Sequence, residues 1–286
     1  MPSMRDIKRR KSSVSSTQQI TKAMKLVSTV KLQRAKSRAE NSRTYFQCMH
    51  DTVASMLKKA GYLNHPYLQA QETSKKSIIL ITSNRGLAGG YSSNMIKLIT
   101  NGDLKKEDLV IYPIGKKGKD ALKRIGYEIG EDYSDVIDDP AYADAMKISA
   151  KLLSDYVAGK IGEIYVAYTG FKNTVTHVPT LLRLLPVDAD VSDENEDTED
   201  RAVMEFEPAG EESINMIIPK YVTSLLYGAM VESVASENGA RMQAMDSATN
   251  NAEDMISKLS LLYNRARQSS ITQELTEIVA GSEAIS

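Results

Sequence analysis

The residue types that could carry chemistry are few and scattered along the sequence. The three histidines, His50, His65 and His177, lie far apart, and none stands at a metal-ligand spacing from another histidine, the single cysteine or a carboxylate pair. Cys48 and His50 are two residues apart, a spacing that points them in different directions on a helix. The sequence therefore indicates neither a metal site nor a Cys–His nucleophile.

Two glycine-rich stretches could face a phosphate group. Residues 115–120 (GKKGKD) lack the four-residue gap and the Ser/Thr after lysine that a P-loop needs, and Asp120 would repel an anion. Residues 83–91 (SNRGLAGGY) follow an apolar run and open an amphipathic segment, so their N–H groups could bind an anion. A tight strand-to-helix turn explains the same glycines equally well. An α/β nucleotide- or anion-binding protein using the Gly86–Gly90 loop therefore stays open as the alternative function.

The charge of the sequence is unevenly distributed. The net charge is −1, yet residues 1–43 hold twelve Lys/Arg against two acids, and residues 188–200 hold eight acids and no base. The acidic tract indicates a solvated loop. The basic segment could bind nucleic acid, but the chain has no Trp, three Phe and a pI near 6.4. A protein partner with acidic loops explains the basic segment better.

Composition excludes several classes of protein. With 42% hydrophobic and 26% charged residues, the chain is neither disordered throughout nor collagen-like. No stretch approaches the roughly 20 apolar residues of a membrane helix, and the first residues lack an apolar signal core. One cysteine cannot form an internal disulfide, which favours a reducing compartment.

The positions of helices and strands can be predicted from Gly and Pro breaks and from hydrophobic periodicity. Residues 4–58 contain no Gly or Pro, which predicts one helix of roughly 80 Å that ends at the Gly61–Pro66 break. Residues from about 211 or 221 to 279 predict a second long helix, with Pro219 at its start or at a kink. Between them, short β-branched runs alternate with amphipathic segments and predict a mixed sheet. The expected strands are 77–82, 109–114, 163–168 and 174–187, and the expected helices are 92–99, 115–125 and 141–157. This gives four segments: 1–60, 61–74, 75–208 and 209–286.

The two long helices are expected to pair. In the second, apolar and small residues alternate in steps of four and three, the seam of a left-handed coiled coil: Met245, Thr249, Ala252, Ile256, Leu259, Tyr263 and Ala266. In the first, Ile20, Met24 and Val27 share this spacing until Lys31 interrupts it. The fold class expected is α/β plus a long coiled coil, with antiparallel N- and C-terminal helices and a Rossmann-like domain between them. Ordinary bundle core is the alternative reading of the seam.

Three long motifs resemble one known family. These are residues 1–35 (MPSMRDIKRR to KLQRA), residues 83–94 (SNRGLAGGYSSN) and residues 241–285 (RMQAMDSATNN to AGSEAI). Their order and spacing closely resemble the gamma subunit of the rotary ATP synthase over essentially the whole chain. One departure is Ser282 after Gly281, where the family usually has alanine; a small residue is kept.

The resemblance implies a central rotor shaft inserted into a ring of three alpha and three beta subunits. It further implies contacts with the epsilon subunit and the membrane c-ring, one copy per complex, and no catalysis, cofactor, metal or nucleic acid of its own. Ion-driven rotation, by protons or sodium, would then be coupled to ATP synthesis or hydrolysis at the beta subunits. No organellar targeting segment or paired-cysteine insert is present, so the implied location is the cytoplasmic face of a bacterial cell membrane, peripherally bound.

The resemblance also assigns partner-binding residues. Met24 and Lys25 are expected near the moving lever of beta, and residues 278–285 in an apolar bearing. The expected polar contact with a beta loop comprises Arg241, Arg267, Gln268, Thr272 and Glu274. Their amide and guanidinium groups could donate to a carboxylate. Phe206 and Glu207 match the loop that contacts the c-ring and epsilon.

Overall fold

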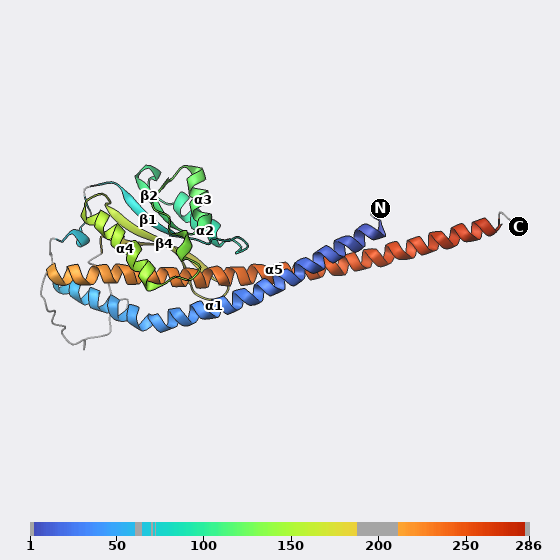
Figure 1. Ribbon diagram of the computed structural model, residues 1–286, viewed down its shortest axis with the longest axis horizontal. Coiled ribbons are helices and arrows are strands. Elements are labelled where there is room, and N and C mark those ends of the chain that lie inside the picture. The colour runs from blue at the N-terminus through green and yellow to red at the C-terminus, as the bar shows by residue number, and fades with distance from the viewer. Residues whose placement is uncertain (1–2, 61–64, 70, 72, 188–210, 284–286) are drawn as a thin grey trace. The chain divides into compact units, whose positions relative to one another are not determined.

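Two long helices frame the chain in the computed structural model, which describes residues 3–60, 65–69, 71, 73–187 and 211–283 (Figure 1). Helix α1 spans Met4–Ala60 and helix α5 spans Glu211–Glu283. Ser3 starts α1 because its Oγ accepts the Asp6 N–H at 3.2 Å and donates to the Asp6 carboxylate at 2.7 Å. Pro219 lies inside α5 and does not begin it.

A five-stranded sheet with the order β3-β2-β1-β4-β5 confirms the expected mixed α/β domain. β1 (Lys76–Ile81), β2 (Leu109–Ile114), β3 (Glu128–Ile129) and β4 (Glu163–Phe171) are parallel, and β5 (His177–Leu185) pairs antiparallel with β4. Helices α2 (Tyr91–Thr100) and α3 (Lys116–Ile125) form the crossovers between the first three strands. Helix α4 (Tyr142–Val157) precedes β4. The two-residue strand β3 was not expected from the sequence.

Helices cover both faces of the sheet, so its central strand is buried throughout. Ile78, Ile79, Leu80 and Ile81 of β1 are each fully buried, which explains an apolar run without alternation. Ile78 and Leu80 pack with α2 and α3, whereas Ile79 and Ile81 pack with α4 and α5. Each such side chain contributes about 1.5–3 kcal/mol when buried.

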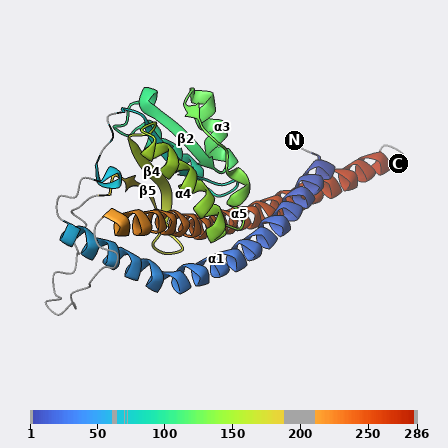
Figure 2. The same ribbon diagram turned by 60° about the vertical axis from the view of Figure 1, so that its left-hand side comes forward.

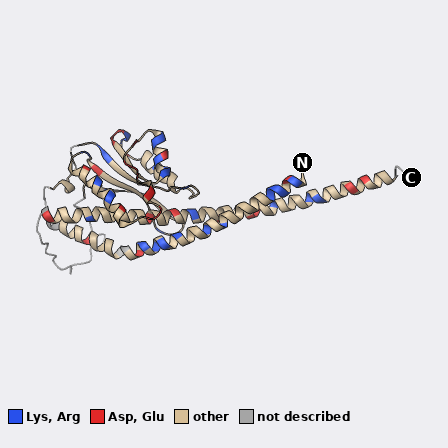
Figure 3. Cartoon of the chain, viewed as in Figure 1, with Lys and Arg blue, Asp and Glu red and all other residues tan. Residues whose placement is uncertain are grey.

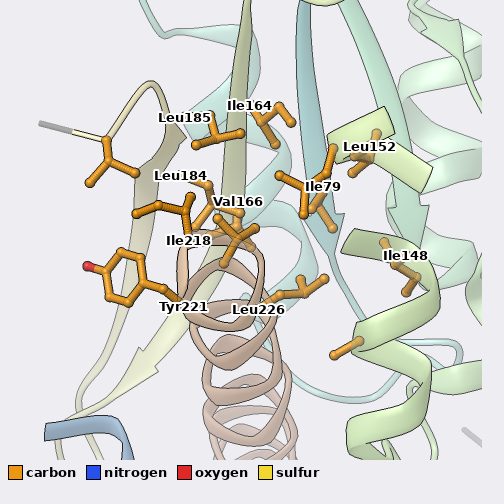
Figure 4. Packing of buried hydrophobic residues seen from close by; sticks show 14 of the residues in the cluster. Ile79, Ile148, Leu152, Ile164, Val166, Leu184, Leu185, Ile218, Tyr221 and Leu226 are labelled. Atoms are coloured by element: carbon orange, nitrogen blue, oxygen red, sulfur yellow. The ribbon is translucent and has the colours of Figure 1, made fainter. Parts of the chain in front are cut away.

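Figure 4 shows the second of these two faces. Ile218, Tyr221 and Leu226 project from α5 toward the side chains of β4 and β5. Ile148 and Leu152 close the same cluster from α4. The first part of α5 is therefore a core helix of the α/β domain.

The chain divides into two compact units, and both long helices run through the boundary. One unit comprises residues 30–240, with the sheet and its helices. The other comprises residues 1–29 and 241–286, whose described parts are two antiparallel helices lying side by side (Figures 1 and 2). We call the helix pair formed by residues 3–29 and 241–283 the shaft.

The shaft confirms one predicted seam and corrects the other. On α5, all seven expected seam residues, from Met245 to Ala266, are buried or partly buried. On α1, the expectation was wrong for Ile20 and Val27, which are each 58% exposed. The side chains that pack toward α5 instead include Thr21, Lys25 and Ser28, with Met24 partly buried beside them. Thus α1 turns a largely polar face toward its neighbour.

Candidate partner-binding surface

In the shaft, α1 carries apolar side chains that are more than half exposed. Ile20, Leu26 and Val27 are 58%, 63% and 58% exposed. At 100° per residue, Ile20 and Val27 lie about a third of a turn around the helix from Thr21, Lys25 and Ser28. An exposed apolar stripe outside the packed face is the surface expected of a helix that meets a second partner.

The end of α5 forms a second bare surface. Residues 271–282 are all exposed, because α1 begins at Met4 and does not extend beside them. Ile271, Leu275, Ile278 and Val279 lie on this segment with 48% to 68% of their surface exposed. Their spacing places them along one side of the helix. We call residues 271–282 the tip.

Met24 and Lys25 lie near the end of the shaft at residue 29, close in sequence to the boundary between the two units. The Lys25 Nζ is 2.5 Å from Asp246 Oδ1, with 40% and 47% of the two side chains exposed. One step along the seam, Thr21 Oγ1 lies 2.8 Å from Thr249 Oγ1. A half-exposed ion pair of this kind contributes only about 0–1 kcal/mol. These directional contacts were not foreseen from the sequence.

The five polar residues expected to meet a beta loop form two separate groups. Arg267, Gln268, Thr272 and Glu274 lie within two turns near the tip, where Thr272 Oγ1 donates to the Gln268 carbonyl at 2.9 Å. Arg241 lies 27 residues earlier on the same helix. That separation is about 40 Å at 1.5 Å per residue. Along the shaft, Arg241 therefore lies close to the level of the Lys25–Asp246 pair and far from Gln268.

Positive charge gathers on α1, as Figure 3 shows. A cleft beside the seam is lined by Lys8, Lys11, Gln19, Tyr263 and three serines, Ser12, Ser15 and Ser16. These side chains supply ammonium, hydroxyl and amide donors and no carboxylate. The shaft thus offers apolar stripes and a basic surface to whatever surrounds it.

The glycine-rich segment at 115–120 is occupied by contacts within the fold. Two of the first N–H groups of α3 are taken by side chains that directly follow β1: Lys116 N–H donates to Asn84 Oδ1 at 3.0 Å, and Gly118 N–H donates to Thr82 Oγ1 at 3.0 Å. A Cβ atom at Gly115 would lie 2.0 Å from the Thr82 carbonyl oxygen. The glycines therefore permit close approach of β1, and the helix N-terminus is already capped.

The Gly86–Gly90 loop has the geometry of a tight turn. Gly89 has a φ of 55° and Leu87 a φ of 64°, the left-handed region that favours glycine. The segment just before the loop is held to α2 by a hydroxyl contact of 2.7 Å between Ser83 and Ser92. In the same segment the Asn84 side chain donates to the Ser134 carbonyl at 2.8 Å. The positive φ at Gly89 explains a glycine at that position without an anion.

The described residues show no group of three or more His, Cys, Asp or Glu that could hold a metal ion. His65 accepts the Tyr67 N–H at 3.2 Å and lies 3.2 Å from Asn215 Oδ1. His177 packs against Gly239 with its pKa lowered by burial. The exposed Cys48 lies on α1. His65 thus serves as a turn residue and His177 as a packing residue.

Helix α5 meets the length and composition of a membrane span, which the sequence analysis did not expect. An 18-residue window within Glu212–Ser282 has a mean hydropathy of 1.2, but 56% of that window is buried inside the protein. Ile214, Ile218 and Leu226 of α5 are completely buried in the α/β domain core. The apolar character of the helix therefore belongs to a core helix.

Several expected features lie outside the described residues. Phe206 and Glu207, expected to contact the c-ring and epsilon, fall in 188–210, as does the acidic tract 188–200. The last residues of the expected bearing, 284 and 285, also lie outside them.

The comparisons with known proteins agree along the whole chain. A family model described as ATP synthase matches residues 3–285. The ATP synthase gamma chain of Lachnoclostridium phytofermentans is 63% identical over 290 residues, covering 100% of both chains. The sodium ion specific ATP synthase gamma chain of Acetobacterium woodii is 38% identical, covering 99% of this chain and 98% of that one.

Solved structures show the same fold. The central stalk and c-ring structure of Tetrahymena thermophila mitochondrial ATP synthase contains a chain that is 25% identical, with a TM-score of 0.58 and coverage of 80% of this chain and 99% of that one. The Euglena gracilis mitochondrial ATP synthase in rotational state 3 contains a chain with a TM-score of 0.72 at 18% identity, covering 99% and 94%. At that identity the likeness concerns the fold alone.

An α/β domain inserted between the two helices of a long antiparallel pair, with bare apolar stripes on the pair, defines a stalk-type subunit of a larger assembly. The chain belongs to the ATP synthase gamma-chain family. The exposed stripe at Ile20 and Val27 is a candidate partner-binding surface that the sequence analysis missed. Its apolar residues had been assigned to the seam, because periodicity does not say which partner a stripe faces.

Proposed function

We propose that the chain is the central rotor stalk of a proton- or sodium-translocating ATP synthase. It couples rotation of the membrane c-ring to ATP synthesis or hydrolysis at the beta subunits. The observation that carries this proposal is the bare tip, where residues 271–282 expose Ile271, Leu275, Ile278 and Val279. Such a helix end needs a surrounding partner to cover it.

The chemistry of the two bare surfaces suits a rotating contact. Apolar contacts are non-directional, so a sleeve around the tip can hold the helix at every angle with little change in energy. Polar contacts are directional and favour particular angles. Coupling requires that each shaft orientation have a different interaction free energy with open and closed beta conformations. The side chains of the shaft supply both kinds of contact.

Two levels along the shaft are proposed to contact the beta subunits. At the level of Lys25 and Arg241, these two residues and Met24 face the moving lever of beta, next to the exposed stripe of Ile20 and Val27. Near the C-terminal end of α5, Gln268 and its neighbours contact a beta loop: Arg267, Thr272 and Glu274. The span of about 40 Å between these levels means that two different parts of the surrounding ring read them.

The remaining features of the proposal follow from the family. One copy of the chain assembles with three alpha and three beta subunits, epsilon and the c-ring, at the cytoplasmic face of a bacterial membrane. The segments 1–60 and 209–286 serve as the rotor helices, 61–74 as a linker and 75–208 as the outer domain. Phe206 and Glu207 contact the c-ring and epsilon. The chain itself catalyses nothing and binds no cofactor or metal.

The alternative of nucleotide or anion binding gains no support from the loop geometry. The α3 N-terminus is capped by Asn84 and Thr82, and Ser83 and Asn84, just before the Gly86–Gly90 loop, are fastened to α2 and to Ser134. We therefore propose no second function.

Co-expression of the chain with alpha and beta subunits of its own source tests the proposal. In a Cys48→Ser background, one cysteine replaces Gln268 and another is placed on the facing beta loop. We expect a complex with one copy of the chain whose ATP hydrolysis stops on disulfide formation and returns on reduction. A cross-link at Cys48 is excluded by the background, and a Lys97→Cys variant in the α/β domain serves as the matched control. Failure to assemble, or turnover unchanged by the cross-link, would reject the rotor role.

A further inference from the structure

The seam of the shaft is unusually polar on the α1 side. Seven α1 residues follow one another in steps of four and three and are buried or partly buried: Ile7, Lys11, Val14, Gln18, Thr21, Lys25 and Ser28. Two of the seven, Ile7 and Val14, carry purely apolar side chains. On α5 the facing seam contains apolar and small residues such as Met245, Ala252 and Ile256. Only a few layers of the seam therefore bring apolar side chains of both helices together.

Those apolar layers distinguish poorly between registers. Sliding one helix by seven residues, about 10 Å, restores the same heptad positions. Ile7 and Val14 are one heptad apart, as are Ile256 and Tyr263, so a slipped pair would again bury apolar against apolar. The apolar layers of the shaft therefore do not by themselves select the observed register.

Two adjacent polar layers provide that selection. Thr21 Oγ1 lies 2.8 Å from Thr249 Oγ1, and Lys25 Nζ lies 2.5 Å from Asp246 Oδ1. Thr21 is 8% exposed. Its hydroxyl also lies 3.0 Å from the Gln18 carbonyl, and the Thr249 hydroxyl lies 2.7 Å from the Met245 carbonyl, so each hydroxyl has a backbone acceptor on its own helix besides its partner across the seam. Polar residues at single seam positions are known to fix register at some cost in stability.

Each one-heptad slip breaks both layers. Thr21 would face Ile256 in one slip and Met242 in the other, leaving the threonine hydroxyls without each other. Asp246 would face Leu32 or Gln18 and lose its ammonium partner. In the first slip Lys25 could meet Glu253 instead, so the ion pair alone does not exclude that slip. The threonine layer opposes it, because this slip breaks the contact between the two hydroxyls and sets the Thr21 hydroxyl against the apolar Ile256.

Register determines the surface that a partner meets. It sets the height of the α1 stripe, Ile20 and Val27, relative to the exposed Met255 and Leu262 of α5. For a partner that contacts both helices at once, a change of register therefore changes the arrangement of the side chains that it meets.

We propose that the Lys25–Asp246 and Thr21–Thr249 layers together lock the register of the shaft. Lys25 is then a positioning residue, with an internal partner in Asp246. The lock itself rests on contacts within the chain. Its effect on ATP turnover rests on the proposed rotor function.

The test uses disulfide trapping in the full chain co-expressed with alpha and beta subunits, in the Cys48→Ser background. Cysteines at Val14 and Ile256, one heptad beyond the threonine layer, report the observed register. Cysteines at Val14 with Tyr263, or at Ile7 with Ile256, report the two slips. Disulfide yields are read by peptide mass after oxidation.

Reversing one charge, Lys25→Asp or Asp246→Lys, should lower the Val14–Ile256 yield at least threefold and raise a slipped yield. The double swap should restore the yield to within twofold of the parent, and Lys22→Asp, on an exposed position of α1, should leave it unchanged. Thr21→Val should raise the Val14–Tyr263 product in particular. Asp246→Asn, which introduces no like-charge contact, should act in the same direction to a smaller extent.

Unchanged yields in both single reversals, or no rescue by the swap, would overturn the lock. ATP hydrolysis of the same complexes should fall severalfold in the single reversals and recover in the swap. A parent chain that does not assemble with alpha and beta would count against the rotor function, while the disulfide yields would still decide the register lock.

Discussion

The imidazole ring of His177 lies against the backbone of Gly239, so closely that a Cβ atom at position 239 would come within 2.8 Å of Cε1. His177 begins β5, and Gly239 lies on α5. Nearby, Thr169 is held to the same helix twice: its N–H donates to Ser233 Oγ at 3.3 Å, and its carbonyl accepts from Ser236 Oγ at 2.9 Å. The end of the β4–β5 hairpin is thus fastened to α5.

Gly239→Ala should destabilise the chain, because the added methyl group has to displace the His177 ring. We expect the free energy of unfolding to fall by about 1–3 kcal/mol, the usual cost of overpacking. Urea denaturation measures it. Gly86→Ala is the matched control, since nothing lies within 4 Å of a Cβ atom there. Equal stabilities of the two variants would show that the hairpin yields freely at this contact.

Burial lowers the pKa of His177 below 6.5, although a hydrogen bond with the Thr174 backbone acts in the opposite direction. A depressed histidine pKa means that the folded state binds fewer protons than the unfolded one. Stability is therefore lost as the pH falls from about 7 through the ordinary histidine range. We expect His177→Phe, which keeps a flat ring beside Phe171, to lessen the decline in Tm between about pH 7 and about pH 5. A decline identical to that of the parent would exclude His177 as its source.

Glu232 has the opposite linkage. Burial raises the pKa of this carboxyl group above 4.5, although a Phe171 backbone hydrogen bond acts against the shift. Its contribution to stability is therefore present below the ordinary pKa and is lost as the pH rises through the raised value. Glu232→Gln should raise the Tm near pH 7 and have little effect near pH 4. Glu212→Gln, exposed on the same helix, is the control and should change neither.

Asn84 caps α3 and fastens the loop after β1. Asn84→Ala should lower the free energy of unfolding by about 0.5–2 kcal/mol, because the Lys116 N–H then loses its acceptor. Asn84→Asp keeps an acceptor and should recover most of this loss.

In calorimetry the parent chain should bind neither ATP nor pyrophosphate. Binding that disappears in Gly89→Ala or Gly90→Ala would instead revive the anion-binding function.

The tip should matter to assembly and not to folding. Ile278 and Leu275 are 68% and 58% exposed, so Leu275→Ser with Ile278→Ser should change the free energy of unfolding by less than about 0.5 kcal/mol. ATP hydrolysis of the assembled complex should fall severalfold. Ile125→Ser alters an equally bare side chain at the end of α3, 49% exposed, and should leave hydrolysis unchanged. A large loss of chain stability would mean that the tip folds against its own chain.

Much of the fold was predictable, since it depends on local signals. The strand 109–114 and the helices near 92–99 and 115–125 were found from β-branched runs and periodicity, close to the observed Leu109–Ile114, Tyr91–Thr100 and Lys116–Ile125. β3 was missed because two residues are too short to show any period. The glycines of 115–120 were rejected as a phosphate loop, but their use in bringing β1 close to α3 needed the contact with Thr82.

By itself the sequence determined every strand except β3, the helices of the α/β domain, the two long helices on either side of it, the family resemblance and the α5 seam. The seam was readable because its apolar residues face inward at heptad spacing. Only the tertiary structure decided which face of α1 meets α5. Helical periodicity reports that a stripe exists and not what covers it, so Ile20 and Val27 looked like core. The polar residues Thr21 and Lys25 lie in the seam because Thr249 and Asp246, more than 220 residues away along the chain, supply their partners.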